Sequence, residues 1–312
     1  MKPRPLALAA LFLAAAALLF AGCAGFGSGD EQDIRTLLNT SGYTNEDNDR
    51  SYGSDDSTVT PGGDGPLTDD PHRVPFVRFR RYIPPRGVSR QVTVDIPAYP
   101  GWPDTTALAT ITTDIRGELR TMFDTTSNPI LVWRKPFEDR AVRKVLLFKH
   151  ENRWWIDKVT PLEFSTQDAA YDLEITGLKV HASSWAAGDT FRLTSTDTML
   201  GKHDLPCFVP SDTVRVWVTA ASNGDSCWTF LHHGRPKWPH RWRKPYLKLD
   251  TYEFHGVWLI GDEGYEKAAI RPSGHDVIGW NSLWADSSAP YVSAAWGLPY
   301  VVKLPAEEIP EE

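Results

Sequence analysis

Aromatic and basic side chains alternate in a proline-rich loop between residues 235 and 248. The side chains in this loop that are best suited to contact a ligand are Trp238, His240, Arg241 and Trp242. Indole rings stack on sugars or nucleobases, and neighbouring cations attract phosphate or carboxylate groups. Three interpretations stay open for the loop: a purely structural role, contact with an anionic glycan or lipid, and contact with nucleic acid. We rank nucleic acid last because the rest of this block is electrically neutral.

The other residues with catalytic or metal-binding chemistry do not form a recognisable pattern. His232 and His233 are adjacent, and neighbouring side chains on a strand point to opposite faces. The sequence has no H-E-x-x-H or paired C-x-x-C spacing, no G-x-S-x-G elbow, no phosphate-binding loop and no dinucleotide fingerprint. We therefore predict no metal, no cofactor and no enzyme activity.

Two cysteines in the second half of the chain, Cys207 and Cys227, are candidates for a disulfide bond. Closing the loop of about 20 residues between them would stabilise the fold by roughly 3 kcal/mol. A turn near Asn223 would place Cys227 opposite a residue close to Ala220, which leaves Cys207 out of register. Bridged and free thiols both stay open.

The third cysteine, Cys23, follows a charged and then apolar N-terminus. Lys2 and Arg4 precede an unbroken apolar run over residues 6–21, which is typical of an export signal. The sequence Phe-Ala-Gly-Cys that ends at Cys23 resembles the lipobox of bacterial lipoproteins. The resemblance implies that residues 1–22 are removed, that Cys23 is acylated and anchors the chain in a bilayer, and that residues 23–29 form a tether. A neutral residue after the cysteine, here Ala24, implies the outer membrane.

The negative charge of the chain is confined to one segment. The net charge is −7, or −9 without the leader, and residues 30–72 hold eleven acids against two bases. Residues 73–312 hold 29 of each sign, so a globally basic nucleic-acid binder is excluded. We expect a short amphipathic helix over residues 30–38 and a disordered acidic segment over residues 39–72. Six arginines between residues 73 and 90 follow this segment, and we expect them to pair with it.

Alternating apolar and polar residues predict long antiparallel strands in a first block, residues 73–165. The expected strands cover residues 91–96, 107–115, 130–134, 141–150 and 153–160. One helix followed by such strands, ending in Trp154-Trp155-Ile156-Asp157, resembles the nuclear-transport-factor-two-like cone fold. That resemblance implies a curved sheet whose interior binds small molecules or hosts isomerase and lyase chemistry. An interior without inward His, Asp or Tyr side chains would argue against such a function.

A second all-β block is predicted over residues 171–304, followed by an acidic tail over residues 305–312. Evenly spaced strands with turns such as Asn223-Gly224 favour a sandwich, in which we expect Trp217 and Trp228 to pack in the core. The sequence Asp-Glu-Gly-Tyr ending at Tyr265 resembles the tyrosine corner of bacterial immunoglobulin-like domains. The predicted fold class is mainly β with two domains, a cone-like α+β sheet and an immunoglobulin-like sandwich.

The order of these parts resembles a group of bacterial envelope lipoproteins. Our first hypothesis is a non-catalytic, membrane-anchored binding, adhesion or spacer module with an envelope protein or glycan as partner. One alternative is a small-molecule-binding protein or an isomerase or lyase that uses the cone interior. Another is a glycan-binding module that acts through Trp238 and Trp242. The sequence leaves the oligomeric state open.

Overall fold

A computed structural model describes residues 28–44, 78–122, 132–233, 242–261 and 268–309, which are mainly β structure. The helices and strands are α2 (Ser28–Thr40), β1 (Arg78–Tyr82), β2 (Val88–Asp95), β3 (Thr106–Met122), β4 (Val132–His150), β5 (Arg153–Val159), β6 (Leu162–Thr166), β7 (Leu173–Ala182), β8 (Phe191–Leu193), β9 (Leu200–Gly201), β10 (Cys207–Phe208), β11 (Thr213–Ser222), β12 (Cys227–His233), β13 (Trp242–Pro245), β14 (Leu247–Asp250), β15 (Glu253–Leu259), β16 (Ala269–Gly279), α4 (Trp280–Trp284) and β17 (Ser293–Val302).

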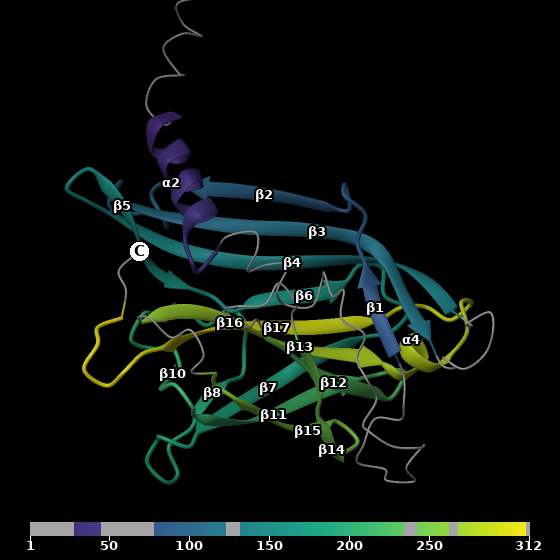
Figure 1. Cartoon of the computed structure of the whole chain (residues 1–312). Helices are drawn as coiled ribbons and strands as arrows, with labels where there is room; N and C mark the ends of the chain where they lie inside the picture. Colours follow the sequence, from purple (N-terminus) through teal and green to yellow (C-terminus); the bar gives the residue numbers. More distant parts are fainter. Residues whose placement is uncertain (1–27, 45–77, 123–131, 234–241, 262–267, 310–312) are drawn as a thin grey trace, which may run out of the picture.

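Twelve of these strands form one large sheet, which we call the curled sheet. Its main path is β1, β3, β4, β6, β17, β16, β12 and β13 (Figure 1). The sheet curls until the two ends of this path, β1 and β13, approach each other. A hydrogen bond joins them, in which Nη1 of Arg243 on β13 donates to the carbonyl oxygen of Phe79 on β1 at 3.0 Å. The result is a half-barrel whose long strands pair antiparallel.

The longest strand pair, β3 with β4, explains how polar residues reach the interior of the half-barrel. These strands stay in register from Thr106 opposite Phe148 to Met122 opposite Val132. The alternation of apolar and polar residues predicted two strands, residues 130–134 and 141–150, whereas the structure has the single strand β4. Lys135, Asp139 and Arg143 lie on the concave face of β4 and are 1%, 6% and 1% exposed. These polar side chains interrupted the hydrophobic alternation without ending the strand.

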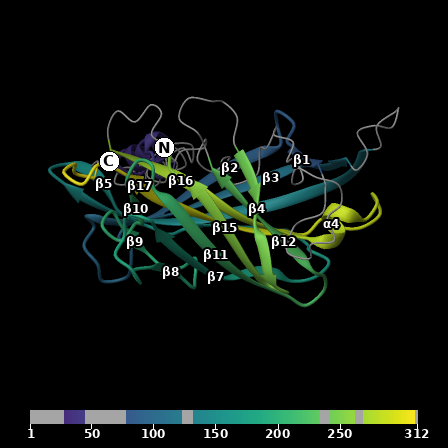
Figure 2. The same cartoon turned by 60° about the horizontal axis from the view of Figure 1, so that its bottom comes forward.

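The remaining strands form a five-stranded sheet in the order β14, β15, β11, β7 and β8. Figure 2 shows β7, β11 and β15 in front of the longer strands of the curled sheet. The two sheets pack through aromatic and aliphatic side chains, including Trp258 of β15 and Tyr300 of β17, whose ring centroids are 6.5 Å apart. Strand β17 lies in the middle of this arrangement, and all ten of its residues are buried.

Strand β17 also joins the two predicted blocks. It pairs with β6 of the first block from Ala294 opposite Ser165 to Gly297 opposite Leu162. On its other side it pairs with β16 over ten residues. Both blocks therefore contribute strands to one continuous sheet.

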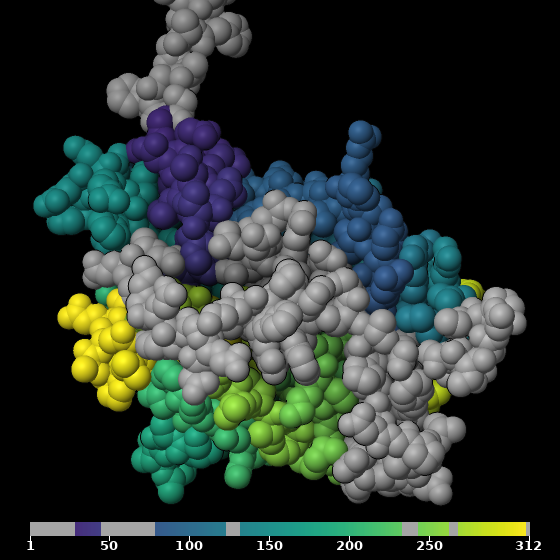
Figure 3. Space-filling model, viewed as in Figure 1, coloured from purple at the N-terminus to yellow at the C-terminus, as the bar shows by residue number. Residues whose placement is uncertain are grey.

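Helix α2 lies against the curled sheet at one end, and Figure 3 shows its outer surface in purple. Its apolar stripe places Ile34 and Leu38 in the core, where both are fully buried. The chain beyond the helix stays packed as far as Thr44, which donates through Oγ1 to the Leu38 carbonyl at 2.7 Å. No helix within the described ranges is long and apolar enough to cross a membrane.

The two tryptophans that we expected in the core have different surroundings. Trp228 of β12 is 4% exposed, as expected. Trp217 of β11 is partly exposed on the outer face of the five-stranded sheet, so that expectation is wrong. The reason is the strand period, because Val214, Val216 and Val218 occupy the inward positions of β11.

Candidate functional site

Most of the sequence-predicted site lies outside the described residues. This holds for Cys23, for Trp238, His240 and Arg241, and for the predicted tyrosine corner at Tyr265. Trp242 is described only through its backbone, as the first residue of β13.

Cys207 and Cys227 are both free thiols in the structure. Cys207 lies opposite Val301, which pairs with Ile270 near the start of β16, whereas Cys227 pairs with Gly279 at its end. Nine residues of strand separate these positions by about 30 Å. A disulfide needs Cα atoms within about 7 Å, so the structure does not permit the bridge that the sequence left open.

The outer face of the five-stranded sheet carries a row of side chains that the sequence reading missed. Strand register aligns one residue from each strand across the sheet. From β8 to β14 these are Arg192, Lys179, Trp217, His255 and Leu247. Each faces outward because its neighbours in sequence point into the sheet interface. The signal was present in the alternation of β11, where Trp217 occupies the same face as Arg215 and Thr219.

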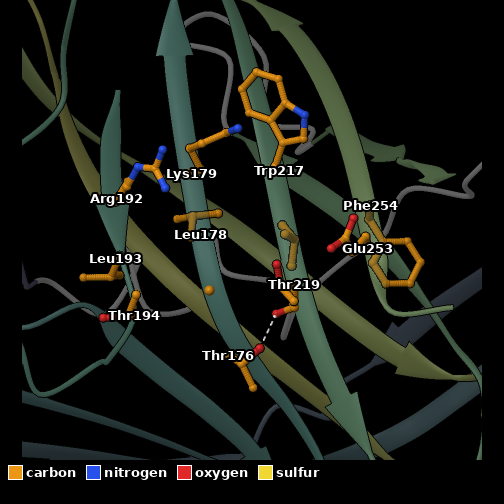
Figure 4. A pocket seen from close by; sticks show the side chains of 12 residues that line it. Thr176, Leu178, Lys179, Arg192, Leu193, Thr194, Trp217, Thr219, Glu253 and Phe254 are labelled. Carbon is orange, nitrogen blue, oxygen red and sulfur yellow. Dashed lines mark hydrogen bonds between the residues drawn. The ribbon is translucent and has the colours of Figure 1, made fainter. Parts of the chain in front are cut away.

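Next to this row lies a hollow of about 390 Å³, within the size range of small-ligand pockets. Gly177 contributes to its floor because it has no side chain, and it lies opposite Thr219 on β11. A Cβ atom at Gly177 would meet only Thr219, at 3.8 Å. Figure 4 shows Arg192 on one side of the hollow and Glu253 on the other. We call this feature the outer hollow.

The outer hollow combines an aromatic ring with charged and hydroxyl groups. The Nζ atom of Lys179 lies 4.0 Å from the centre of the Trp217 ring, which is a cation–π contact. His255 packs against the same indole at 5.0 Å between ring centroids. Burial, together with the nearby Arg215 and Lys179 cations, lowers the pKa of His255, which favours the neutral imidazole at pH 7.

Threonine hydroxyls complete the lining of the outer hollow. Thr176 donates through Oγ1 to the Thr219 carbonyl at 3.3 Å, as the dashed line in Figure 4 marks. Thr194 and Thr219 add further hydroxyl groups, and Glu253 adds a carboxylate that accepts hydrogen bonds. The arrangement suits a polar ligand with several hydroxyl groups. It does not present a nucleophile next to a general base.

A second group of polar residues lies inside the half-barrel, and we call it the interior cluster. Its members are Arg81, Asp139, His232, Asp276, Tyr291 and Ser293. Arg81 pairs with both carboxylate oxygens of Asp276, at 2.7 and 3.0 Å. His232 Nε2 and Ser293 Oγ lie 3.1 and 2.8 Å from the same carboxylate. We had expected Arg81 to pair with the acidic segment. In the structure it pairs with Asp276 of β16, which that expectation did not include.

A tyrosine hydroxyl connects the two carboxylates of the interior cluster. Tyr291 accepts from Nε of Arg81 at 2.8 Å and donates to Oδ2 of Asp139 at 2.9 Å. Burial raises the pKa of Asp139 to about 6, although Arg81 works in the opposite direction. Burial also disfavours the charge on Asp276, but Arg81 and His232 hold the pKa of this carboxyl below its usual range. The two carboxylates therefore differ in proton affinity because of their partners.

Comparisons with known proteins return no match: no family model, no curated protein and no solved structure is similar to this chain. Within the part of the chain that the structure describes, no three His, Cys, Asp or Glu side chains gather into a group that could hold a metal ion.

Proposed function

We propose that the chain is a non-catalytic lipoprotein of the bacterial envelope, anchored through acylated Cys23, and that its body is a binding module for carbohydrate. The observation that carries the binding role is the outer hollow with Trp217 at its edge. The export signal and lipobox-like sequence support the anchor. We further propose that β1 to β6 with α2 form a cone-like domain, and that the five-stranded sheet forms an immunoglobulin-like sandwich with β12, β16 and β17, which face it.

The chemistry of the outer hollow favours a sugar over an apolar ligand. A sugar ring has apolar C–H faces and a rim of hydroxyl groups, which matches an indole beside threonines and a carboxylate. The hollow lies on the outer face of the five-stranded sheet and is open to solvent, as a site for one unit of a longer chain needs to be. Lys179 and Arg192 add positive charge on one side, which favours sugars that carry a carboxylate or phosphate group.

The experiment is a glycan array probed with the purified full chain and with a Trp217→Ala variant. We expect binding to at least one bacterial surface glycan and a loss of about tenfold or more in the variant. Trp102→Ala is the matched control, because Trp102 is 46% exposed but lies between β2 and β3, outside the five-stranded sheet. Binding that is equal in wild type and Trp217→Ala, or no binding at all, would contradict the carbohydrate site. Mass spectrometry of the mature N-terminus tests the acyl anchor separately.

The interior cluster supports a second candidate, a small-molecule-binding protein or an isomerase-type enzyme. The half-barrel carries inward His, Asp and Tyr side chains, and the Asp139 pKa of about 6 suits proton transfer near neutral pH. The test is a thermal-shift screen of small metabolites against wild type and Asp139→Asn. A compound that raises the Tm of wild type alone supports this candidate. Compounds that stabilise both proteins equally, or an empty screen, count against it.

A further inference from the structure

Three exposed aromatic side chains gather at one end of the curled sheet. Tyr99 and Trp102 lie in the connection between β2 and β3 and are 38% and 46% exposed. Their rings meet edge to face with centroids 4.9 Å apart. The connection is held in shape by hydrogen bonds, including Trp102 N to the Tyr99 carbonyl at 3.0 Å and Thr106 Oγ1 to the Pro103 carbonyl at 2.7 Å.

The third aromatic side chain, Phe148, is 41% exposed and belongs to the neighbouring strand β4. It lies opposite Thr106, the first residue after the β2–β3 connection, and Lys149 N donates to the Thr105 carbonyl at 2.7 Å. Across the β4–β5 hairpin, Phe148 lies opposite Trp155. We call the surface formed by Tyr99, Trp102, Phe148 and Trp155 the aromatic end.

A basic side chain and a hollow accompany these rings. The guanidinium of Arg153 lies 5.1 Å from the centre of the Trp155 ring. Phe148 and Trp155 also line a hollow of about 410 Å³ that reaches Tyr43, just beyond α2. An indole beside an arginine is a combination that suits the headgroup region of a bilayer, where apolar and charged groups meet.

The first turn of α2 lies at this same end of the molecule. Asp30 accepts hydrogen bonds from Lys149, the neighbour of Phe148, and from Trp154 Nε1 at 3.1 Å. Figures 1 and 3 show α2 next to the β4–β5 hairpin. Ser28, where α2 begins, is five residues after Cys23, a distance of at most about 18 Å in extended chain. An acyl group on Cys23 therefore holds the aromatic end close to the membrane.

We propose that the aromatic end rests on the bilayer surface, with Tyr99 and Trp102 in the interfacial region and Arg153 near lipid phosphates. This inference rests on the proposed anchor at Cys23 for its choice of a bilayer over a protein partner. Acyl chains alone fix the distance of the body from the membrane but leave its orientation free. Contact through the aromatic end fixes that orientation and directs the opposite parts of the body away from the lipid.

The experiment uses the acylated full chain in vesicles of phosphatidylethanolamine and phosphatidylglycerol. A fluorophore is attached at Trp102→Cys in a Cys207→Ser background, because Cys207 is the more accessible of the two other thiols. Nitroxide-labelled lipids are then used as quenchers. Tyr82→Cys is the matched control, since Tyr82 is also 41% exposed but lies opposite Glu118, twelve residues along β3 from Thr106 and about 40 Å away.

We expect lipid nitroxides to quench the label at position 102 several-fold more strongly than the label at position 82. Equal quenching at the two positions overturns the inference, whether the aromatic end is then free in solution or covered by a protein. Flotation of the unacylated Cys23→Ser chain with and without Tyr99→Ala and Trp102→Ala separates the two proposals. If Cys23 carries no lipid but flotation depends on these aromatics, the anchor is wrong and the inference stands. An acylated Cys23 with an unquenched position 102 leaves the anchor intact and rejects the inference.

Discussion

The guanidinium of Arg81 and the carboxylate of Asp276 lie 2.7 Å apart in the interior of the half-barrel, 195 residues apart in sequence. Both side chains are almost fully buried, at 3% and 1% exposure. Arg81 belongs to the edge strand β1, whereas Asp276 belongs to β16 on the far side of the curled sheet. The pair therefore ties the edge of the first block to the centre of the second.

Removing one member of this pair should destabilise the fold strongly. Arg81→Met leaves the Asp276 carboxylate buried without its main counter-charge, and such changes reduce the free energy of unfolding by about 3–5 kcal/mol. Urea denaturation measures the change. The control is Arg116→Met, which removes the exposed pair with Glu138 and should have little effect. Similar stability losses in the two variants would contradict this account.

The stability of the protein should depend on pH through Asp139. Burial raises its pKa to about 6 in the folded state, from about 4 in the unfolded chain, so the folded state binds this proton more tightly. The stabilisation that this proton provides is present below pH 4 and is lost as the pH rises through 6. By linkage the loss is about 3 kcal/mol. Unfolding free energies of wild type and Asp139→Asn, measured from pH 4 to 8, should therefore shift in favour of the variant with rising pH. Parallel curves would show that Asp139 does not titrate in this range.

A bulky side chain at Gly177 should block the outer hollow without disturbing the fold. The space above Gly177 is open except for Thr219 at 3.8 Å, so Gly177→Leu fills the hollow with little strain. We expect glycan binding to fall at least tenfold while the Tm changes by only a few degrees. Gly261→Leu is the control, because nothing lies within 4 Å of that Cβ position and Gly261 does not line the hollow. Unchanged binding in Gly177→Leu would place the ligand elsewhere.

On the inner face of the five-stranded sheet, an added side chain should destabilise the fold. A Cβ atom at Gly256 would come within 2.1 Å of the Tyr246 ring, which is 1% exposed and has no room to move. Overpacking of this kind destabilises a protein by about 1–3 kcal/mol. Gly256→Ala should therefore lower the Tm by several degrees, and Gly177→Ala should leave it nearly unchanged. Equal Tm values for the two alanine variants would argue against the assigned strand faces.

The free cysteines should react with thiol reagents at very different rates. Burial raises the pKa of Cys227 to about 12, and its side chain is fully buried in β12. Cys207 is only partly buried, with a pKa raised by the same cause. In the folded protein we expect slow labelling of Cys207 and none of Cys227, followed by rapid labelling of both in guanidinium chloride. A single band of unchanged mobility with and without reductant is expected on gel electrophoresis.

Local pattern was sufficient to predict most strands, but it did not predict how they pair. The sequence predicts strands over residues 213–220 and 227–233, close to the observed β11 and β12; β11 alternates because it has one buried face, whereas the described side chains of β12 are buried on both faces. The pairing of β6 with β17 joins residues about 130 positions apart, and no local signal specifies such a contact. The same limit applies to the site. From the sequence alone, Asp139 and Asp276 would be expected on the surface, because they are charged. They are buried because the curl of the sheet turns these faces of β4 and β16 inward.

The exposure of Trp217 could have been predicted from the sequence, because the alternation of apolar and polar residues in β11 places it on the outward face. Tryptophan in a strand is usually buried, and this expectation outweighed the position of Trp217 on the polar face of β11. The valines at positions 214, 216 and 218 had already assigned the inward face. For predicting which side of a strand is buried, the alternation of the whole strand therefore deserves more weight than the usual burial of one residue type.

The position of β17 has a consequence for biogenesis. This strand is buried along its whole length, yet it occupies residues 293–302, so a growing chain acquires it only after every other described strand has been synthesised. Until then β6 and β16 lack their shared neighbour, and the apolar side chains on both sides have nothing to pack against. A polypeptide with this layout can therefore complete its large sheet only after β17 has been synthesised.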